Sequence, residues 1–200
     1  MPLPQTLARS LGKPIPLSAP LPRTAATLSR SVGGTAGTLS YSLGLTMQIQ
    51  LQSNWCWAAT SSSVFHFFQP ASSAGSQCDI VNAELHQSTC CVNGASSVCN
   101  QPWYLDRALT RVGHFKSMSN GPAAVPVLST ELGGKRPVCC RIGWAGGGGH
   151  FVAVDGLAMS ATPFLTVKDP IYGTSSISYA TFQTAYQGSG SWTHTYLTQP

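Results

Sequence analysis

Apolar positions recur at helical spacing over three stretches in the first half of the chain. The first covers residues 57–68, where Pro70 prevents any extension, and the second covers residues 79–86. The third begins near Pro102, a residue type that suits a first helical turn, and its apolar stripe consists of Leu105, Ala108, Leu109 and Val112. Residues 47–113 are therefore predicted to form a helical half.

The second half of the chain changes to short runs of β-branched and aromatic residues, which are typical of strands. Strands are predicted at residues 138–144, 150–157, 164–169, 175–178 and 192–198, with short helices at 127–132 and 179–186. A helical half followed by a strand-rich half is the pattern of an α+β fold.

Residues 50–60, Gln-Leu-Gln-Ser-Asn-Trp-Cys-Trp-Ala-Ala-Thr, place a cysteine where the first helix begins. Ser53 or Asn54 is expected to cap this helix, so that Cys56 falls in its first turn. The amides of a first helical turn are unpaired, and that end of the helix carries partial positive charge. Because both effects favour a thiolate over a thiol, the sequence predicts a nucleophilic sulfur at Cys56.

This stretch resembles the active-site helix of papain-like cysteine peptidases, which place a glutamine six residues before the nucleophilic cysteine and a tryptophan directly after it. Gln50 and Trp57 occupy these two positions. The longer string is more similar to a bacterial subgroup that includes the AvrRpt-type effector proteases, which plant pathogens inject into host cells. The resemblance covers residues 47–200 and implies a papain-like α+β fold with the active site in a cleft between the two halves.

A thiolate needs a partner that protonates the leaving amine, and histidine suits this task because its ordinary pKa is near ~6.5. His150 opens a predicted strand directly after four glycines, and papain-like enzymes carry their histidine at the start of such a strand. His194 is the runner-up, although we interpret it as an ordinary strand residue. His66 is excluded because it lies about ten residues beyond Cys56 in the first helix, roughly 15 Å away along the axis. His86 and His114 are expected at the surface.

The imidazole in turn needs an acceptor that orients it. Asp155 lies five residues after His150 in the same predicted strand, and its side chain points to the opposite face because side chains alternate along a strand. Asp169 ends the next predicted strand and is the expected acceptor, with a plain turn position before Pro170 as the alternative. The resemblance adds Gln50, whose amide would stabilise the oxyanion together with the backbone N–H of Cys56.

Composition and charge limit the possible functions. Hydrophobic residues make up 42% of the chain, enough for a core, whereas charged residues make up only 8% against about 25% in a typical soluble domain. Such weakly charged surfaces are more common in exported proteins. Residues 47–200 hold seven basic and six acidic residues, and this near-neutrality argues against nucleic-acid binding. No apolar run approaches the ~18 residues that span a bilayer.

Residues 1–46 are predicted to form a flexible basic arm, with four basic residues and no acidic one. Prolines and glycines interrupt every periodic pattern there, and prolines also break any apolar core of a secretory signal. The composition fits a transit peptide or an unstructured export signal of a bacterial effector, and equally a linker from a longer parent protein. We expect the arm to be dispensable for folding and to be trimmed, with Gly33-Gly34 as a candidate site of self-cleavage.

Six cysteines remain beside Cys56, an even number that favours disulfides formed in an oxidising compartment. At least one bridge is predicted within residues 78–99, which hold four of these cysteines. Zinc is the alternative, but no Cys-x-x-Cys or Cys-x-x-His spacing is present. Cys139 and Cys140 lie in a predicted strand, where core packing is the simplest interpretation. No metal and no cofactor is predicted.

The sequence therefore predicts a thiol endopeptidase that hydrolyses protein or peptide substrates through Cys56, His150 and Asp169. We expect a secreted or injected bacterial effector or toxin, for which a cognate inhibitor or immunity protein would be a further partner. One alternative is an acyltransferase or deamidase that uses the same Cys–His pair. Another is a non-catalytic binding module derived from a peptidase, against which the complete Cys, His and Asp set argues.

Overall fold

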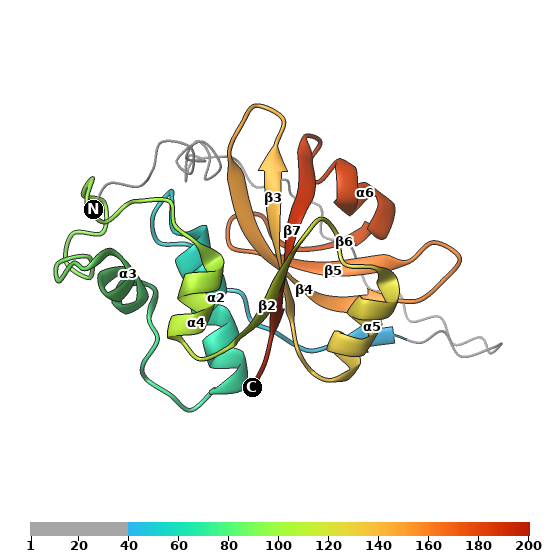
Figure 1. Cartoon of the computed structure of the whole chain (residues 1–200), viewed down its shortest axis with the longest axis horizontal. Coiled ribbons are helices and arrows are strands. Elements are labelled where there is room, and N and C mark those ends of the chain that lie inside the picture. Colours follow the sequence, from blue (N-terminus) through green and yellow to red (C-terminus); the bar gives the residue numbers. More distant parts are fainter. Residues whose placement is uncertain (1–39) are drawn as a thin grey trace.

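The computed structural model describes residues 40–200, so the expectations for residues 1–39, self-cleavage at Gly33-Gly34 included, lie outside the described residues. Three helices from the first half of the chain lie on one side of a sheet, and two later helices lie on its other side (Figure 1). The predicted α+β arrangement is confirmed. Among the helices of residues 40–200, none is long and apolar enough to cross a bilayer.

The sheet is antiparallel throughout, and its strands follow the order β2-β7-β3-β4-β5-β6, with β1 paired to β4 outside that path. The strands are β1 (Ser40–Ser42), β2 (Phe115–Asn120), β3 (Val138–Trp144), β4 (Gly149–Ala158), β5 (Phe164–Asp169), β6 (Gly173–Ser178) and β7 (Gly190–Thr198). The five strands predicted from the sequence are present, whereas β1 and β2 were not predicted. The polar edge strand β2 exposes most of its residues and so lacks an apolar alternation.

The helices α2 (Cys56–Phe68), α3 (Gln77–Leu85) and α4 (Leu105–Arg111) form the helical half (Figure 1). The other side of the sheet carries α5 (Val125–Gly133) and α6 (Tyr179–Thr184). Each helix coincides with a predicted one to within a few residues. The largest difference is at α4, which begins three residues after Pro102.

Alternate residues of the central strands serve two separate cores. Cys139, Phe151 and Ala153 pack with α2, α3 and α4, whereas Cys140 and Val152 pack in the core that contains α5 and α6. The neighbouring thiols Cys139 and Cys140 are free and fully buried, as expected for core residues. Burial raises the pKa of Cys139 to about 12, which keeps it a neutral thiol.

The predicted boundary between arm and folded domain at residue 47 is wrong, because the chain is already folded from Ser40. β1 pairs with residues 156–158 of β4, on the edge that β3 covers only as far as Val154. The amide of Leu43 donates to the carbonyl of Asp155 at 3.0 Å, and the side chain of Leu45 is buried. A three-residue strand is too short to show a period, and this explains why its sequence resembles that of the arm.

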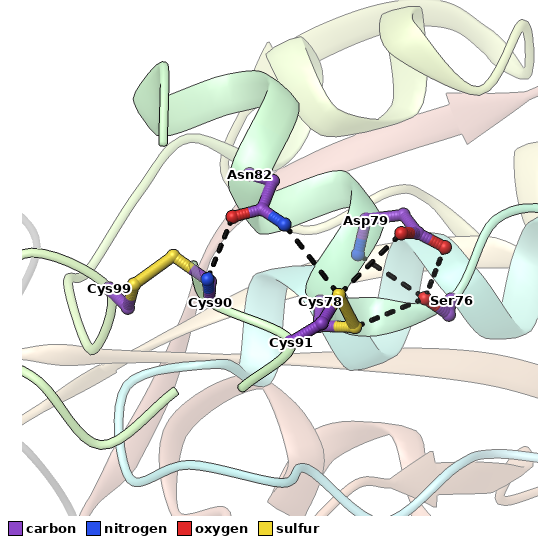
Figure 2. The surroundings of a disulfide bond; sticks show 7 residues. All are labelled: Ser76, Cys78, Asp79, Asn82, Cys90, Cys91 and Cys99. Carbon is purple, nitrogen blue, oxygen red and sulfur yellow. Dashed lines mark hydrogen bonds between the residues drawn. A yellow bond between two sulfur atoms is a disulfide. The ribbon is translucent and has the colours of Figure 1, made fainter. Parts of the chain in front are cut away.

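Two disulfides hold the loop between α3 and α4, Cys78–Cys91 and Cys90–Cys99. Figure 2 shows both bridges beside the start of α3, where Ser76 caps the helix by accepting from the amide of Asp79 at 3.2 Å. The side chain of Asn82 ties the loop back to α3 by accepting from the amide of Cys90 at 2.9 Å. At least one bridge was predicted within residues 78–99, and the structure confirms it.

Candidate active site

Cys56 is the first residue of α2, at the boundary between the helical half and the sheet. The expected side-chain cap from Ser53 or Asn54 is not formed, because Trp55 is the N-cap of the helix and makes no side-chain hydrogen bond there. Within residues 40–200, the backbone N–H of Cys56 has no acceptor. The sulfur therefore lies beside a free amide at the positive end of a 13-residue helix.

The loop closed by the disulfide Cys90–Cys99 holds the start of α2. The indole N–H of Trp55 donates to the carbonyl of Cys99 at 2.9 Å, and that of Trp57 donates to the carbonyl of Gln101 at 3.0 Å. Both tryptophans are fully buried. The two residues that flank the cysteine in the sequence are thus anchors, which give Cys56 a defined position.

A second set of hydrogen bonds joins the same loop to the residues just before α2. The amide of Asn54 donates to Asn100 Oδ1 at 2.9 Å, and its side chain donates to the Asn100 carbonyl at 2.8 Å. Asn100 also donates to the hydroxyl of Ser53 at 2.9 Å. Sequence reasoning missed Asn100, since only its neighbour Cys99 carried a recognisable signal.

His150 is the second residue of β4 and is 1% exposed. Its Nε2 atom lies 2.9 Å from Oδ1 of Asp169. Since Nε2 faces the carboxylate, Nδ1 is the nitrogen left for the sulfur. Burial lowers the pKa of His150, but the negative charges and hydrogen bonds of Asp169 and Cys56 outweigh it and raise the pKa to about 10.

Asp169 is the last residue of β5 and is nearly fully buried. Its Oδ1 atom accepts from the amides of Ile171 at 2.6 Å and Tyr172 at 2.9 Å, in addition to His150. Burial raises the pKa of Asp169, but the charge of His150 and these hydrogen bonds lower the pKa by a larger amount, so the net shift is downward. The carboxylate is thereby kept ionised and its orientation is determined by the turn that follows β5.

Two aromatic residues complete the surroundings of the imidazole and were not singled out in the sequence. The hydroxyl of Tyr186 donates to Oδ2 of Asp169 at 2.8 Å. Burial and then the charge of Asp169 raise the pKa of Tyr186, so this hydroxyl remains protonated as a donor. The ring of Trp144 stacks beside His150 with 6.1 Å between ring centroids. Tyr186 lies 17 residues after Asp169 and Trp144 lies six residues before His150, and no local sequence pattern marks either residue.

The structure separates Asp155 from His150, in agreement with the alternation argument. Oδ1 of Asp155 accepts from the amide of Leu45 at 2.8 Å, and its Oδ2 lies 3.6 Å from Nζ of Lys168. Asp155 thus supports the segment that leads to α2. His194 is half-buried on β7, and burial followed by the charge of Arg141 lowers its pKa.

His114 is buried, so its predicted surface position is wrong. It is 2% exposed, packs against Phe65 and Phe68, and its Nδ1 atom lies 2.9 Å from the carbonyl of Gln199. The turn after α4 folds back under the end of α2, and a short sequence pattern does not show this contact. Burial lowers the pKa of His114, despite its hydrogen bond with Gln199.

Gln50 is buried beside the segment that leads to Cys56, but its amide nitrogen already has two acceptors. Nε2 donates to the carbonyls of Gln52 at 2.8 Å and Ser53 at 3.0 Å. Within the described residues, its Oε1 atom is buried without a partner. The backbone amide of Gln50 also donates to the carbonyl of Pro170 at 3.1 Å, which links the approach to α2 with the turn after Asp169.

One group of potential metal ligands occurs in residues 40–200, formed by Cys78, Asp79 and Cys91. The two sulfur atoms of this group are joined in a disulfide, which removes the thiolates that a zinc ion requires.

A cysteine at the start of a helix facing a histidine at the start of a strand, with an aspartate behind the histidine, defines a papain-like cysteine peptidase. The model of the family described as papain-like cysteine protease AvrRpt2 matches residues 39–187, and the chain belongs to this family. A search of curated proteins finds no match. The protein is a cysteine protease, and its substrates are accordingly proteins or peptides.

Proposed function

We propose that this protein is a thiol endopeptidase that hydrolyses peptide bonds through Cys56, His150 and Asp169. The observation that supports this proposal most strongly is the position of the buried His150 ring between two partners. Asp169 contacts one ring nitrogen at 2.9 Å, and Cys56 is among the groups that raise the pKa of the ring.

In the proposed reaction, the Cys56 thiolate attacks the carbonyl carbon of the scissile peptide bond. The C–N bond then breaks as the His150 imidazolium transfers its proton to the leaving amine, and a thioester remains on Cys56. A water molecule next gives one proton to His150 and attacks the thioester carbon. The C–S bond breaks, the carboxylic acid product leaves, and the thiolate–imidazolium pair is restored. Asp169 orients the ring and stabilises its positive charge.

The oxyanion that forms during each attack would accept a hydrogen bond from the backbone N–H of Cys56, which has no other acceptor in the described residues. Gln50 is proposed as the second donor, by way of its Nε2 group. This group would exchange its longer contact, at 3.0 Å to the carbonyl of Ser53, for the oxyanion when substrate binds.

We propose further that the protein acts outside the cell that makes it, as a secreted or translocated bacterial effector or toxin. Two observations support this. The family model carries the name of the AvrRpt2 protease, and the loop beside the active site contains two disulfides, which form in oxidising surroundings. A cognate inhibitor or immunity protein would be a further partner of such an enzyme.

The test is incubation of the wild-type protein with a protein mixture and with an epoxide inhibitor that alkylates thiolates. The wild type is expected to generate new amino termini and to become labelled at Cys56, whereas Cys56→Ala and His150→Ala should be inactive with an unchanged fold by circular dichroism. Asp169→Ala should retain more activity, since the proton carrier remains. Transfer of an acyl group to an added amine, or loss of side-chain amides without chain cleavage, would replace the peptidase by an acyltransferase or a deamidase.

A further inference from the structure

Tyr186 lies in the tight turn that joins α6 to β7, and it is 1% exposed. Its backbone N–H donates to the carbonyl of Gly190 at 2.8 Å, and the N–H of Gly190 donates back to the carbonyl of Tyr186 at 2.8 Å. A Cβ atom at residue 190 would lie 2.9 Å from that carbonyl oxygen and 2.8 Å from the ring of Trp144. The glycine at this position therefore allows the turn and the Trp144 ring to approach each other.

Aromatic packing holds the ring of Tyr186 independently of its hydroxyl group. The ring of Phe182 contacts it edge-on with 5.2 Å between ring centroids, and the ring of Trp144 stacks beside it at 6.5 Å. Phe182 and Tyr186 both belong to the core that contains α5 and α6. Because these contacts do not involve the hydroxyl, its removal should leave the ring in place.

The hydroxyl of Tyr186 contacts the carboxylate oxygen that His150 does not use. It donates to Oδ2 of Asp169 at 2.8 Å. Oδ1 of the same carboxylate accepts instead from His150 and from the amides of Ile171 and Tyr172. Among residues 40–200, Tyr186 is the one hydrogen-bond donor to Oδ2. Without it, Oδ2 would be a buried acceptor that lacks a partner, which is a costly state.

The same hydrogen bond affects how strongly Asp169 holds the imidazolium. A hydrogen bond to a carboxylate stabilises its charged form and makes it a weaker base. Asp169 contacts Nε2 of His150 through Oδ1 at 2.9 Å, so a weaker base attracts the ring proton less strongly. In the proposed reaction the imidazolium must release a proton to the leaving amine. Tyr186 can therefore influence this step without contact with the substrate.

We propose that Tyr186 is a positioning residue that acts through Asp169. Its hydroxyl holds Oδ2, so that Oδ1 stays directed at Nε2 of His150, and it keeps the carboxylate a weak enough base for the imidazolium to release its proton. This inference rests on the proposed peptidase function of Cys56, His150 and Asp169.

The test is Tyr186→Phe in the full chain, with Tyr179→Phe as the matched control. Tyr179 packs against the same core, and its hydroxyl donates to the carbonyl of Ala123 at 2.9 Å instead of to a residue of the candidate site. On a peptide that the wild type cleaves, kcat should fall roughly 10-fold in Tyr186→Phe, the effect of one hydrogen bond to a charged group, while KM stays within about twofold. Tyr179→Phe should keep the wild-type kcat and KM.

A spectroscopic measurement distinguishes positioning from a general loss of stability. In protein with isotope-labelled histidine, the proton on Nε2 of His150 should resonate further downfield in Tyr186→Phe, because Oδ1 becomes a stronger acceptor. Tyr179→Phe should leave this resonance unchanged. A tyrosine fluorinated next to its hydroxyl, incorporated in place of Tyr186, is a stronger donor and should move the resonance upfield. This second variant keeps the hydroxyl, so the test does not depend on correct folding of Tyr186→Phe.

Two results would overturn the proposal while the peptidase function stands. One is a wild type that cleaves with the same kcat as Tyr186→Phe, and the other is a His150 resonance that neither change at residue 186 moves. Failure of the wild type to cleave any peptide would overturn the peptidase function and, with it, the role of Tyr186 in catalysis.

Discussion

At the scale of single residues, Asp169 determines how the imidazole is presented to the sulfur. Its Oδ1 atom accepts from two backbone amides and from His150, and its Oδ2 atom accepts from Tyr186. Four donors around one carboxylate leave it little freedom to rotate. The ring of His150 is thus held by a rigid acceptor, which is the condition for a reproducible distance to Cys56.

The charge of Asp169 makes a prediction for the pH dependence of activity. The carboxylate and Cys56 raise the pKa of His150 to about 10, so the imidazolium should persist well above neutral pH and be lost as the pH rises toward that value. Asp169→Asn keeps the shape but removes the negative charge, which lowers the pKa of His150. We expect the alkaline limb of kcat/KM to move to lower pH. An alkaline limb at the same pH in both proteins would exclude this role of the charge.

Gln50 supplies a second prediction at this scale, because its amide has two candidate roles. If Nε2 moves to the oxyanion, Gln50→Ala should lower kcat by roughly 100- to 1000-fold with little change in thermal stability. If the amide only supports the carbonyls of Gln52 and Ser53, the melting temperature should fall together with the activity. Kinetics and differential scanning fluorimetry on the same preparation separate the two outcomes, with Gln52→Ala as the matched control.

At the scale of elements, the start of α2 depends on a loop that has no regular structure of its own. The carbonyls of Cys99 and Gln101 bind the two indoles that flank Cys56, and the bridge Cys90–Cys99 closes this loop. The second bridge, Cys78–Cys91, joins the same loop to α3. The two bridges therefore differ in their distance along the chain from the residues that anchor Cys56.

This difference predicts unequal effects of removing each bridge. Closing a loop of this size contributes about 2–3 kcal/mol in the chain-entropy model, so the pairs Cys90→Ser/Cys99→Ser and Cys78→Ser/Cys91→Ser should lose similar stability. Activity below the melting temperature should fall much more for the first pair, since the carbonyl of Cys99 loses its position. Equal activity losses at matched stability would show that the loop does not position α2.

At the scale of the whole molecule, β1 and the segment after it connect the sheet with the helical half. The segment covers the exposed edge of β4, buries Leu45 and satisfies the carboxylate of Asp155 before it reaches Gln50. The chain thus passes from the sheet to the active-site helix along a single extended strap formed by residues 40–50.

The strap predicts where the chain can be shortened. A protein that begins at residue 47 should be less stable than one that begins at residue 40 by at least about 2 kcal/mol, because Leu45 and the edge of β4 become exposed. Thermal and urea denaturation of the two shortened proteins measure this difference. Equal stability of the two shortened proteins would mean that β1 and Leu45 contribute nothing to the stability of the fold.

The sequence by itself determined the elements and the nucleophile candidate. Helical spacing and a proline delimited α2, and the strands β3 and β5 were predicted with the bounds that the structure has, since each depends on neighbours close along the chain. Alternation along β4 also sufficed to prefer Asp169 over Asp155 as the partner of His150. These inferences need only the period of a helix or a strand.

The tertiary structure alone decided the contacts between segments that are far apart in the chain. Tyr186 reaches Asp169 across 17 residues, Asn100 reaches Asn54 across 46, and β1 pairs with β4 across more than 100. The burial of His114 and the engaged amide of Gln50 have the same origin. A local pattern records which face a side chain takes, whereas the partner on that face depends on how the whole chain packs.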